Sequence, residues 1–201
     1  MRRGIVLAGM WVAGCAGVFA ATDAPPQVDW KTMLPMVQLA VRHAFPMVAE
    51  QAHYPASIAK TADVAPGVQV ALVDLGMGGY TEEMTVVRLE GETPVAARFK
   101  GRDEKIVPMT FLSGTEEGKG GSVELVPKDH VVFAGHWETK KKKKLKCGGE
   151  AYRWDDTAKN FEYEKKLTKS MSKEFCAKVA ARPAVAAPAV PAAAAAAPAS
   201  N

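Results

Sequence analysis

The feature that most constrains the fold is a two-residue apolar period between positions 68 and 99. Such alternation places every second side chain on one face of a strand, so it indicates a half-buried sheet. Glycines at positions 76, 78 and 79 and the segment 91–94, Gly-Glu-Thr-Pro, separate the runs and favour turns. The sequence therefore predicts three consecutive strands, whose alternating residues are Val68, Val70, Leu72, Met84, Val86, Val95, Ala97 and Phe99.

The rest of the central region continues this pattern between two amphipathic segments. Apolar residues recur at helical spacing over 32–45 and over about 169–181, which predicts a helix near each end. Pro35 fits the first turn of the first helix, and Pro46 ends or kinks it. The predicted fold is α+β, a mainly antiparallel β meander (sandwich or open barrel) with an N-terminal and a C-terminal helix. Its further strands are expected at 106–112, 123–126, 130–138, 145–154 and 161–163, with a glycine-rich loop at 113–121.

Length and composition divide the chain into three parts. Residues 28–182 are enough for a single β-rich domain with its own core. Residues 183–201 consist almost entirely of proline, alanine and valine, which bury too little apolar surface to offset the cost of chain ordering. We expect this Pro/Ala-rich tail to be disordered and semi-extended.

The N-terminus has the three regions of a secretory signal. Arg2 and Arg3 precede an apolar run over 4–20 that ends in small residues, which predicts a signal peptide over 1–20. The segment Val12-Ala13-Gly14-Cys15 also resembles the bacterial lipobox, in which the cysteine is acylated and becomes the first mature residue. Two processing routes therefore stay open: cleavage after residue 20, or a lipoprotein signal that ends before Cys15. Both predict an extracytoplasmic protein, in the periplasm or, if lipidated, in the outer envelope, with membrane attachment only through the Cys15 lipid.

The cysteine count predicts one disulfide bond. Cys15 belongs to the signal segment, which leaves Cys147 and Cys176 as an even pair in an oxidising compartment. We therefore expect a Cys147–Cys176 bridge that ties the last helix to the sheet.

The basic character of the chain is local. Residues 21–201 contain 24 basic and 22 acidic residues, and six of these basic residues are the lysines of 140–146. A fold-wide basic face for nucleic acid is therefore not expected. Like charges repel, so we expect the lysine run to form a solvated hairpin tip.

His136 and Glu138 are the residues most suggestive of a metal or water site. They lie two apart on one predicted strand, so their Cβ atoms share a face at about 6.5–7 Å. A catalytic zinc site needs three protein ligands, and His130 lies about 20 Å along the same strand. A third ligand must then come from a neighbouring strand, and otherwise the pair forms an exposed polar face.

Other catalytic and nucleotide-binding motifs do not fit. In the glycine-rich segment 113–121, Gly118-Lys119 is followed by Gly120 where a P-loop requires Ser or Thr. The sequence has no Gly-x-Ser-x-Gly nucleophile elbow. We therefore predict no catalytic residue, no metal and no cofactor.

Two weak resemblances involve short segments. The stretch from Asp74 through Gly76 and Gly78 to Glu83 resembles a degenerate hairpin of calcium-binding propeller-type repeats. It lacks the middle aspartates of that motif, so we expect a turn without metal. The segment 148–154, with Gly-Gly-Glu-Ala-Tyr followed by Trp154, is similar to that of uncharacterised exported bacterial proteins, and this similarity implies no known activity.

These observations favour a non-catalytic binding or structural module of the cell envelope. We expect a monomer whose partner is an envelope component or a polysaccharide. The alternative is a metal- or carboxylate-dependent hydrolase that acts on an envelope polymer. Side chains that converge around His136 would favour the hydrolase, and exposed aromatic residues such as Tyr80 or Trp154 would favour the binding module.

Overall fold

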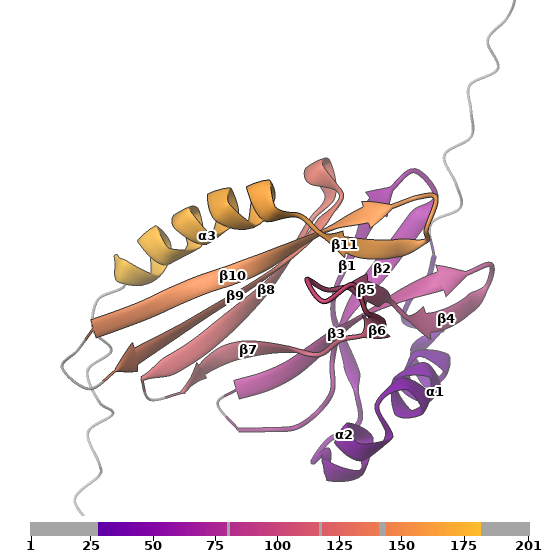
Figure 1. The fold of residues 1–201 in the computed structure, drawn as a ribbon. Coiled ribbons are helices and arrows are strands. Elements are labelled where there is room, and N and C mark those ends of the chain that lie inside the picture. The colour runs from indigo at the N-terminus through magenta and orange to yellow at the C-terminus, as the bar shows by residue number, and fades with distance from the viewer. Residues whose placement is uncertain (1–27, 80, 117, 141–143, 182–201) are drawn as a thin grey trace, which may run out of the picture.

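The computed structural model describes residues 28–79, 81–116, 118–140 and 144–181, which form one sheet with helices against it (Figure 1). The segments 1–20 and 183–201, and with them Cys15, lie outside the described residues. The helices are α1 (Leu34–Ala44), α2 (Pro46–Gln51) and α3 (Lys165–Ala180), with a 3-10 turn at Pro127–Asp129. The strands are β1 (Ser57–Ala65), β2 (Val68–Asp74), β3 (Thr81–Glu90), β4 (Thr93–Ala96), β5 (Arg98–Lys100), β6 (Ile106–Pro108), β7 (Phe111–Glu116), β8 (Lys119–Val126), β9 (Val131–Lys140), β10 (Lys144–Asp155) and β11 (Asn160–Tyr163).

The strands pair in the order β1-β2-β3-β7-β8-β9-β10-β11-β5-β6, with β4 also paired to β3. All pairings are antiparallel except that of β11 with β5. The sheet does not close, because β1 and β6 remain at its ends. The predicted α+β class, the mainly antiparallel pairing and the two terminal helices are confirmed. None of the helices in the described residues is long and apolar enough to span a membrane.

The sheet curves around a core built from its inner face. Side chains from nine strands meet there, and the Phe99 ring stacks on Phe161 and meets Phe111 and Tyr152 edge to face. Phe99 is fully buried at the centre, 5.1 Å from both Phe111 and Phe161 by ring centroids. The alternate residues of the same strands form two outer cores, since side chains of a strand point to opposite faces. One outer core lies between α1 and β2–β3, and the other between α3 and β9–β10.

Three successive contacts attach α3 to the edge of β10. The Thr168 hydroxyl accepts a hydrogen bond from the Ala151 amide (2.9 Å), and the Ser172 hydroxyl donates one to the Gly149 carbonyl (3.3 Å). Cys176 forms the predicted disulfide with Cys147, with Cα atoms 5.7 Å apart. Four helix residues rise about 6 Å and two strand residues about 6.6 Å, so the two repeats stay in register. The helix thereby covers the edge of β10 that would otherwise be free.

The glycine-rich segment 113–121 is not the predicted loop. It forms the end of β7 and the start of β8, which pair from Gly114 opposite Gly121 to Glu116 opposite Lys119. The reason is close backbone approach: a Cβ at Gly121 would lie 2.2 Å from the Leu112 carbonyl oxygen. Glycine is therefore needed inside these strands, where the sequence pattern suggested a loop.

Other boundaries also differ from prediction. The third predicted strand divides at Ala97 into β4 and β5. The Ala97 amide still donates a 2.7 Å hydrogen bond to the Val86 carbonyl of β3, whereas β5 pairs with β11. The predicted strand 106–112 likewise divides into β6 and β7, and α3 begins at Lys165 instead of about 169. Strand β1 was not predicted, because alanine, lysine and aspartate occupy much of this irregular edge strand.

Candidate functional site: a charged pocket beside β5 and β11

An open pocket of about 400 Å³ lies where β5, β11 and the first residue of α3 meet. The parallel pairing of β11 with β5 sets Glu162 opposite Lys100 and so brings distant segments together. A second cavity, between α1 and α2, measures about 80 Å³, which is below the usual size of ligand pockets. We therefore place the candidate site in the larger pocket, which is lined by Lys100, Gly101, Arg102, Glu104, Glu162, Tyr163 and Lys165.

Lys100 forms the first pair of contacts in this pocket. Its ammonium group lies 2.8 Å from the Glu104 carboxylate and 3.6 Å from that of Glu162. The hydrogen bond and charge of Glu104, followed by the charge of Glu162, raise the pKa of Lys100. Lys100 therefore stays protonated and holds both carboxylates in place.

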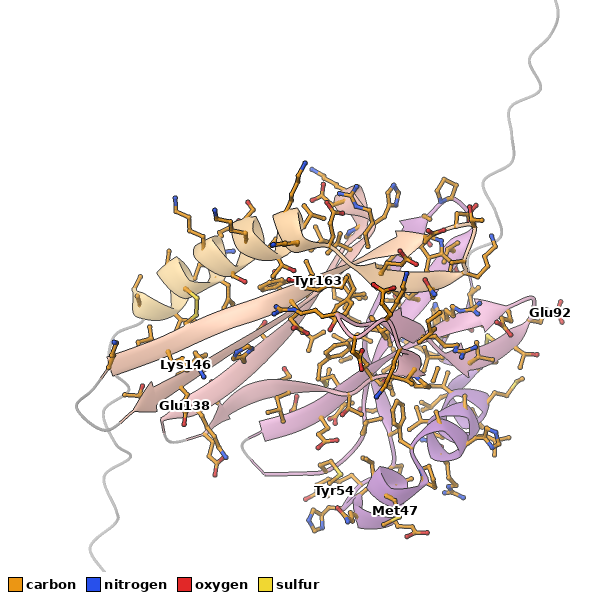
Figure 2. All side chains as sticks on the ribbon, viewed as in Figure 1. Met47, Tyr54, Glu92, Glu138, Lys146 and Tyr163 are labelled. Atoms are coloured by element: carbon orange, nitrogen blue, oxygen red, sulfur yellow. A yellow bond between two sulfur atoms is a disulfide. The ribbon has the colours of Figure 1, made fainter. Side chains whose placement is uncertain are left out.

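Arg102 connects the pocket to the buried core. Its guanidinium lies 4.7 Å from the centre of the Tyr163 ring and 3.1 Å from the Glu150 carboxylate. The Tyr152 hydroxyl donates a 2.6 Å hydrogen bond to the same carboxylate. Burial, and then the hydrogen bond to Glu150, raises the pKa of Tyr152, so this hydroxyl remains a donor. Figure 2 shows Tyr163 at the junction of β11 and α3.

Sequence patterns missed this site for an identifiable reason. The segment 100–104 has the composition of a turn, and nothing local indicates that it contacts β10 and β11. The one available signal was Glu150 and Tyr152, which are two apart on a strand and therefore share a face. Both residues belong to the Gly-Gly-Glu-Ala-Tyr segment.

His136 and Glu138 lie on the exposed part of the inner face of β9, beyond the core. The cross-strand neighbours of His136 are Gly121 and Gly148, which carry no ligand atoms in their side chains. Those of Glu138 are lysines, and Figure 2 shows one of them, Lys146, beside it. Among the described residues, no three His, Cys, Asp or Glu side chains come close enough to hold a metal ion. The strands beside this pair therefore do not supply the third ligand that the metal hypothesis requires.

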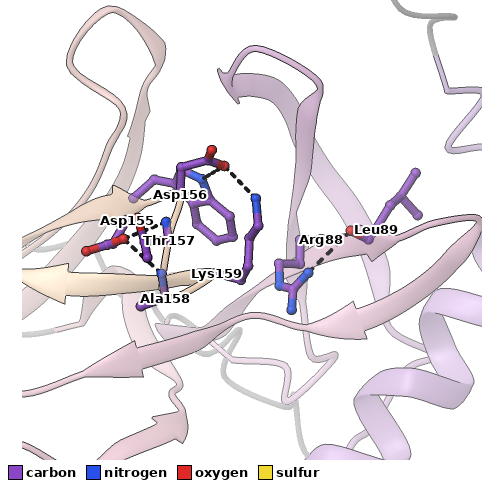
Figure 3. Close-up of polar contacts among 8 residues, drawn as sticks. Arg88, Leu89, Asp155, Asp156, Thr157, Ala158 and Lys159 are labelled. Carbon is purple, nitrogen blue, oxygen red and sulfur yellow. Dashed lines mark hydrogen bonds and ion pairs between the residues drawn. The ribbon is translucent and has the colours of Figure 1, made fainter.

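Trp154 is a core residue and not an exposed binding residue. It is 7% exposed, and its ring packs against Phe161 and lies 5.7 Å from the Arg88 guanidinium. Figure 3 shows Arg88 beside the turn that follows Trp154. In that turn the Asp155 carboxylate accepts hydrogen bonds from the amides of residues 157 and 158, at 2.7 and 2.9 Å. Tyr80, the other proposed aromatic residue, lies outside the described residues.

The Asp74 hairpin uses its carboxylate within the turn. Asp74 accepts a 2.9 Å hydrogen bond from the Gly76 amide, and the Gly76 carbonyl accepts bonds from the amides of His53 and Tyr54. Gly76 and Gly78 both have positive φ, a conformation that glycine adopts without a steric penalty.

Comparison of the chain with models of known families, with characterised proteins and with solved structures finds no match.

Proposed function

We propose that the protein is an exported cell-envelope module that binds an envelope polysaccharide without catalysis, and that the charged pocket is its binding site. The observation that supports this most is the set of polar groups around the pocket. Arg102, Glu162 and Lys165 offer donors and acceptors around a pocket that the Tyr163 ring also lines. Sugar hydroxyls are both donors and acceptors, so such a set suits a carbohydrate.

The pairing of these groups favours binding over catalysis. A general acid or base must change its protonation state during the reaction. Here Lys100 is held by two carboxylates, which raise its pKa, Glu104 foremost, and Arg102 forms an ion pair with Glu150. Such groups orient a ligand well and exchange protons poorly near pH 7.

Export is part of the same proposal. The signal-like segment 1–20 motivates it, and the Cys147–Cys176 disulfide is compatible with an oxidising compartment. Intact mass of the mature protein tests it. A chain that begins at residue 21 or at an acylated Cys15 supports export, and an unprocessed cytoplasmic chain contradicts it.

Co-sedimentation with insoluble bacterial cell-wall polysaccharide tests the binding site. Arg102→Ala removes a pocket residue, whereas Arg98→Ala removes the same charge from β5 outside the pocket, where Arg98 bonds the Ile106 carbonyl. We expect Arg102→Ala to weaken binding by about tenfold, which corresponds to about 1.4 kcal/mol. Arg98→Ala should bind like the native protein.

Two results would contradict this function. One is equal binding by native protein, Arg102→Ala and Arg98→Ala, or no binding by any of them. The other is release of soluble fragments from the polymer, lost on His136→Ala or Glu138→Gln, which would support the hydrolase instead.

A further inference from the structure

Helix α3 carries a concentrated positive charge. Its five lysines and one glutamate give a formal charge of +4, which equals that of the whole chain. Lys165, Lys169 and Lys173 follow at intervals of four, so they form a row about 12 Å long on one flank of the helix. All of the lysines of α3 are exposed.

This row is placed where it opposes helix stability. Like charges four residues apart repel, and lysines in the first turn oppose the helix dipole. Lys165 and Lys166 occupy that turn, which has no acidic residue. Among the described residues, the lysines at 165, 166, 169 and 173 have no acidic partner within 4 Å, whereas Lys178 is paired with Glu174 at 2.8 Å. Stability alone does not account for this arrangement, but binding of an anion does.

The attachment of α3 to β10 fixes the row in space. Each of its lysines stands three residues before one that contacts β10: Thr168, Ser172 or Cys176. The row therefore lies above the edge of β10. Lys144 and Lys146 are also exposed, but they lie on the face of β10 opposite α3, because Lys146 pairs with Glu138 whereas the neighbouring Cys147 faces the helix. We name the exposed surface of α3 the lysine ridge: Lys165, Lys166, Lys169 and Lys173.

The rest of the molecule has the opposite charge. Outside α3 and the segment 140–146, residues 21–201 contain 13 basic and 21 acidic residues. The positive charge is thus concentrated in α3 and in the segment 140–146, and the field of α3 attracts and orients an anionic partner. Lys165 also lines the charged pocket, so the ridge leads directly into it.

We propose that the lysine ridge binds a linear acidic polysaccharide of the cell envelope, which it guides into the pocket. This inference rests on the proposed function and names the chemical class of its ligand. A row of charges along a helix matches a linear polymer with repeated carboxylates or sulfates.

Other anionic partners fit the ridge less well. It contains no aromatic residue and no arginine, which single-stranded nucleic-acid surfaces use for stacking on bases. A helix on a membrane surface inserts its apolar face. Phe175 and Val179 of α3 are instead buried against the sheet, and Leu167 and Met171 are half-buried there.

Binding of polygalacturonate, a linear carboxylate polysaccharide, tests the proposal, with its methyl ester as the uncharged control. The variant Lys166→Gln/Lys169→Gln/Lys173→Gln alters the ridge and no pocket residue. The matched control removes the same charge from exposed Lys31, Lys60 and Lys128. We expect the ridge variant to lose affinity about tenfold or more at low salt, and its log–log salt slope to fall by about 2–3. The control should stay within about twofold of the native protein.

The outcomes separate the ridge from the pocket. An equal loss of polygalacturonate affinity in the ridge and control variants, or no loss in either, would contradict binding by the ridge. Tighter binding to random single-stranded DNA or to phosphatidylglycerol vesicles than to polygalacturonate would contradict it as well. If Arg102→Ala loses cell-wall binding while the ridge variant keeps polygalacturonate, only the ridge fails. If Arg102→Ala behaves like Arg98→Ala while the ridge variant loses polygalacturonate, the pocket fails and the ridge stands.

Discussion

Helix α3 packs closely against Gly135, where there is no space for a side chain larger than hydrogen. A Cβ at this position would lie 2.8 Å from three atoms of the Phe175 ring, which is buried beneath α3. We expect Gly135→Ala to destabilise the fold by about 1–3 kcal/mol through overpacking. Gly148 is the matched control, because a Cβ there meets only the His136 ring, at 3.8 Å. Urea denaturation should show little change for Gly148→Ala, and equal effects of the two substitutions would contradict this account.

The Tyr152 hydroxyl, which donates a hydrogen bond to Glu150, makes the stability of the fold depend on pH. Its pKa is raised in the folded state, so above about pH 10 the unfolded chain releases this proton while the folded one keeps it. The unfolded state then binds fewer protons, and stability falls as pH rises. We expect a loss of about 1.4 kcal/mol per pH unit from this group above pH 10.

Tyr152→Phe isolates that contribution from other groups that titrate in the same range. The unfolding free energy of this variant, measured by urea denaturation from pH 8 to 11, should fall less steeply than that of the native protein. Parallel slopes would show that Tyr152 ionises normally in the folded state.

At the scale of elements, the sequence was informative where one strand face is buried. The predicted strand at 130–138 places Val131, Phe133 and Trp137 on one face by their even spacing, and all three pack under α3. The division of the third predicted strand was not predictable, because it depends on the pairing of Phe99 with Phe161 far along the chain. The same non-local pairing creates the pocket. Residues such as Arg102 therefore gave no local signal of their position.

The disulfide is the covalent member of the three contacts between α3 and β10. It joins residues 29 positions apart, and closing such a loop stabilises a fold by about 3–4 kcal/mol in the chain-entropy model. We expect Cys147→Ser/Cys176→Ser to lose that amount in urea denaturation, and a reducing agent to have the same effect on the native protein. The reductant should leave the double variant unchanged. Non-reducing peptide mapping that found two free thiols in the mature protein would contradict the bridge.

At the scale of the whole molecule, the concentration of lysines in α3 and in the segment 140–146 affects the choice of partner and contributes little to folding. Replacing the six lysines of 140–146 with serine changes the formal charge of residues 21–201 from +2 to −4. Of the six, Lys144 and Lys146 are exposed. Lys146 stands opposite Glu138, and such a cross-strand pair contributes about 0.2–1 kcal/mol. Relief of repulsion within the run offsets this loss, because like charges at close spacing are destabilising.

We therefore expect the six-serine variant to melt within a few degrees of the native protein in circular dichroism, since surface charges contribute about 0–1 kcal/mol. Its affinity for polygalacturonate should fall at low salt, but by less than that of the ridge variant, because Lys144 and Lys146 lie on the face of β10 opposite α3 and act on the polymer only through their field. A large drop in melting temperature would mean that the run stabilises the hairpin itself. Unchanged stability together with weaker, less salt-sensitive binding would show that the lysines contribute to partner binding and not to folding. Such charges act on the partner through their electrostatic field.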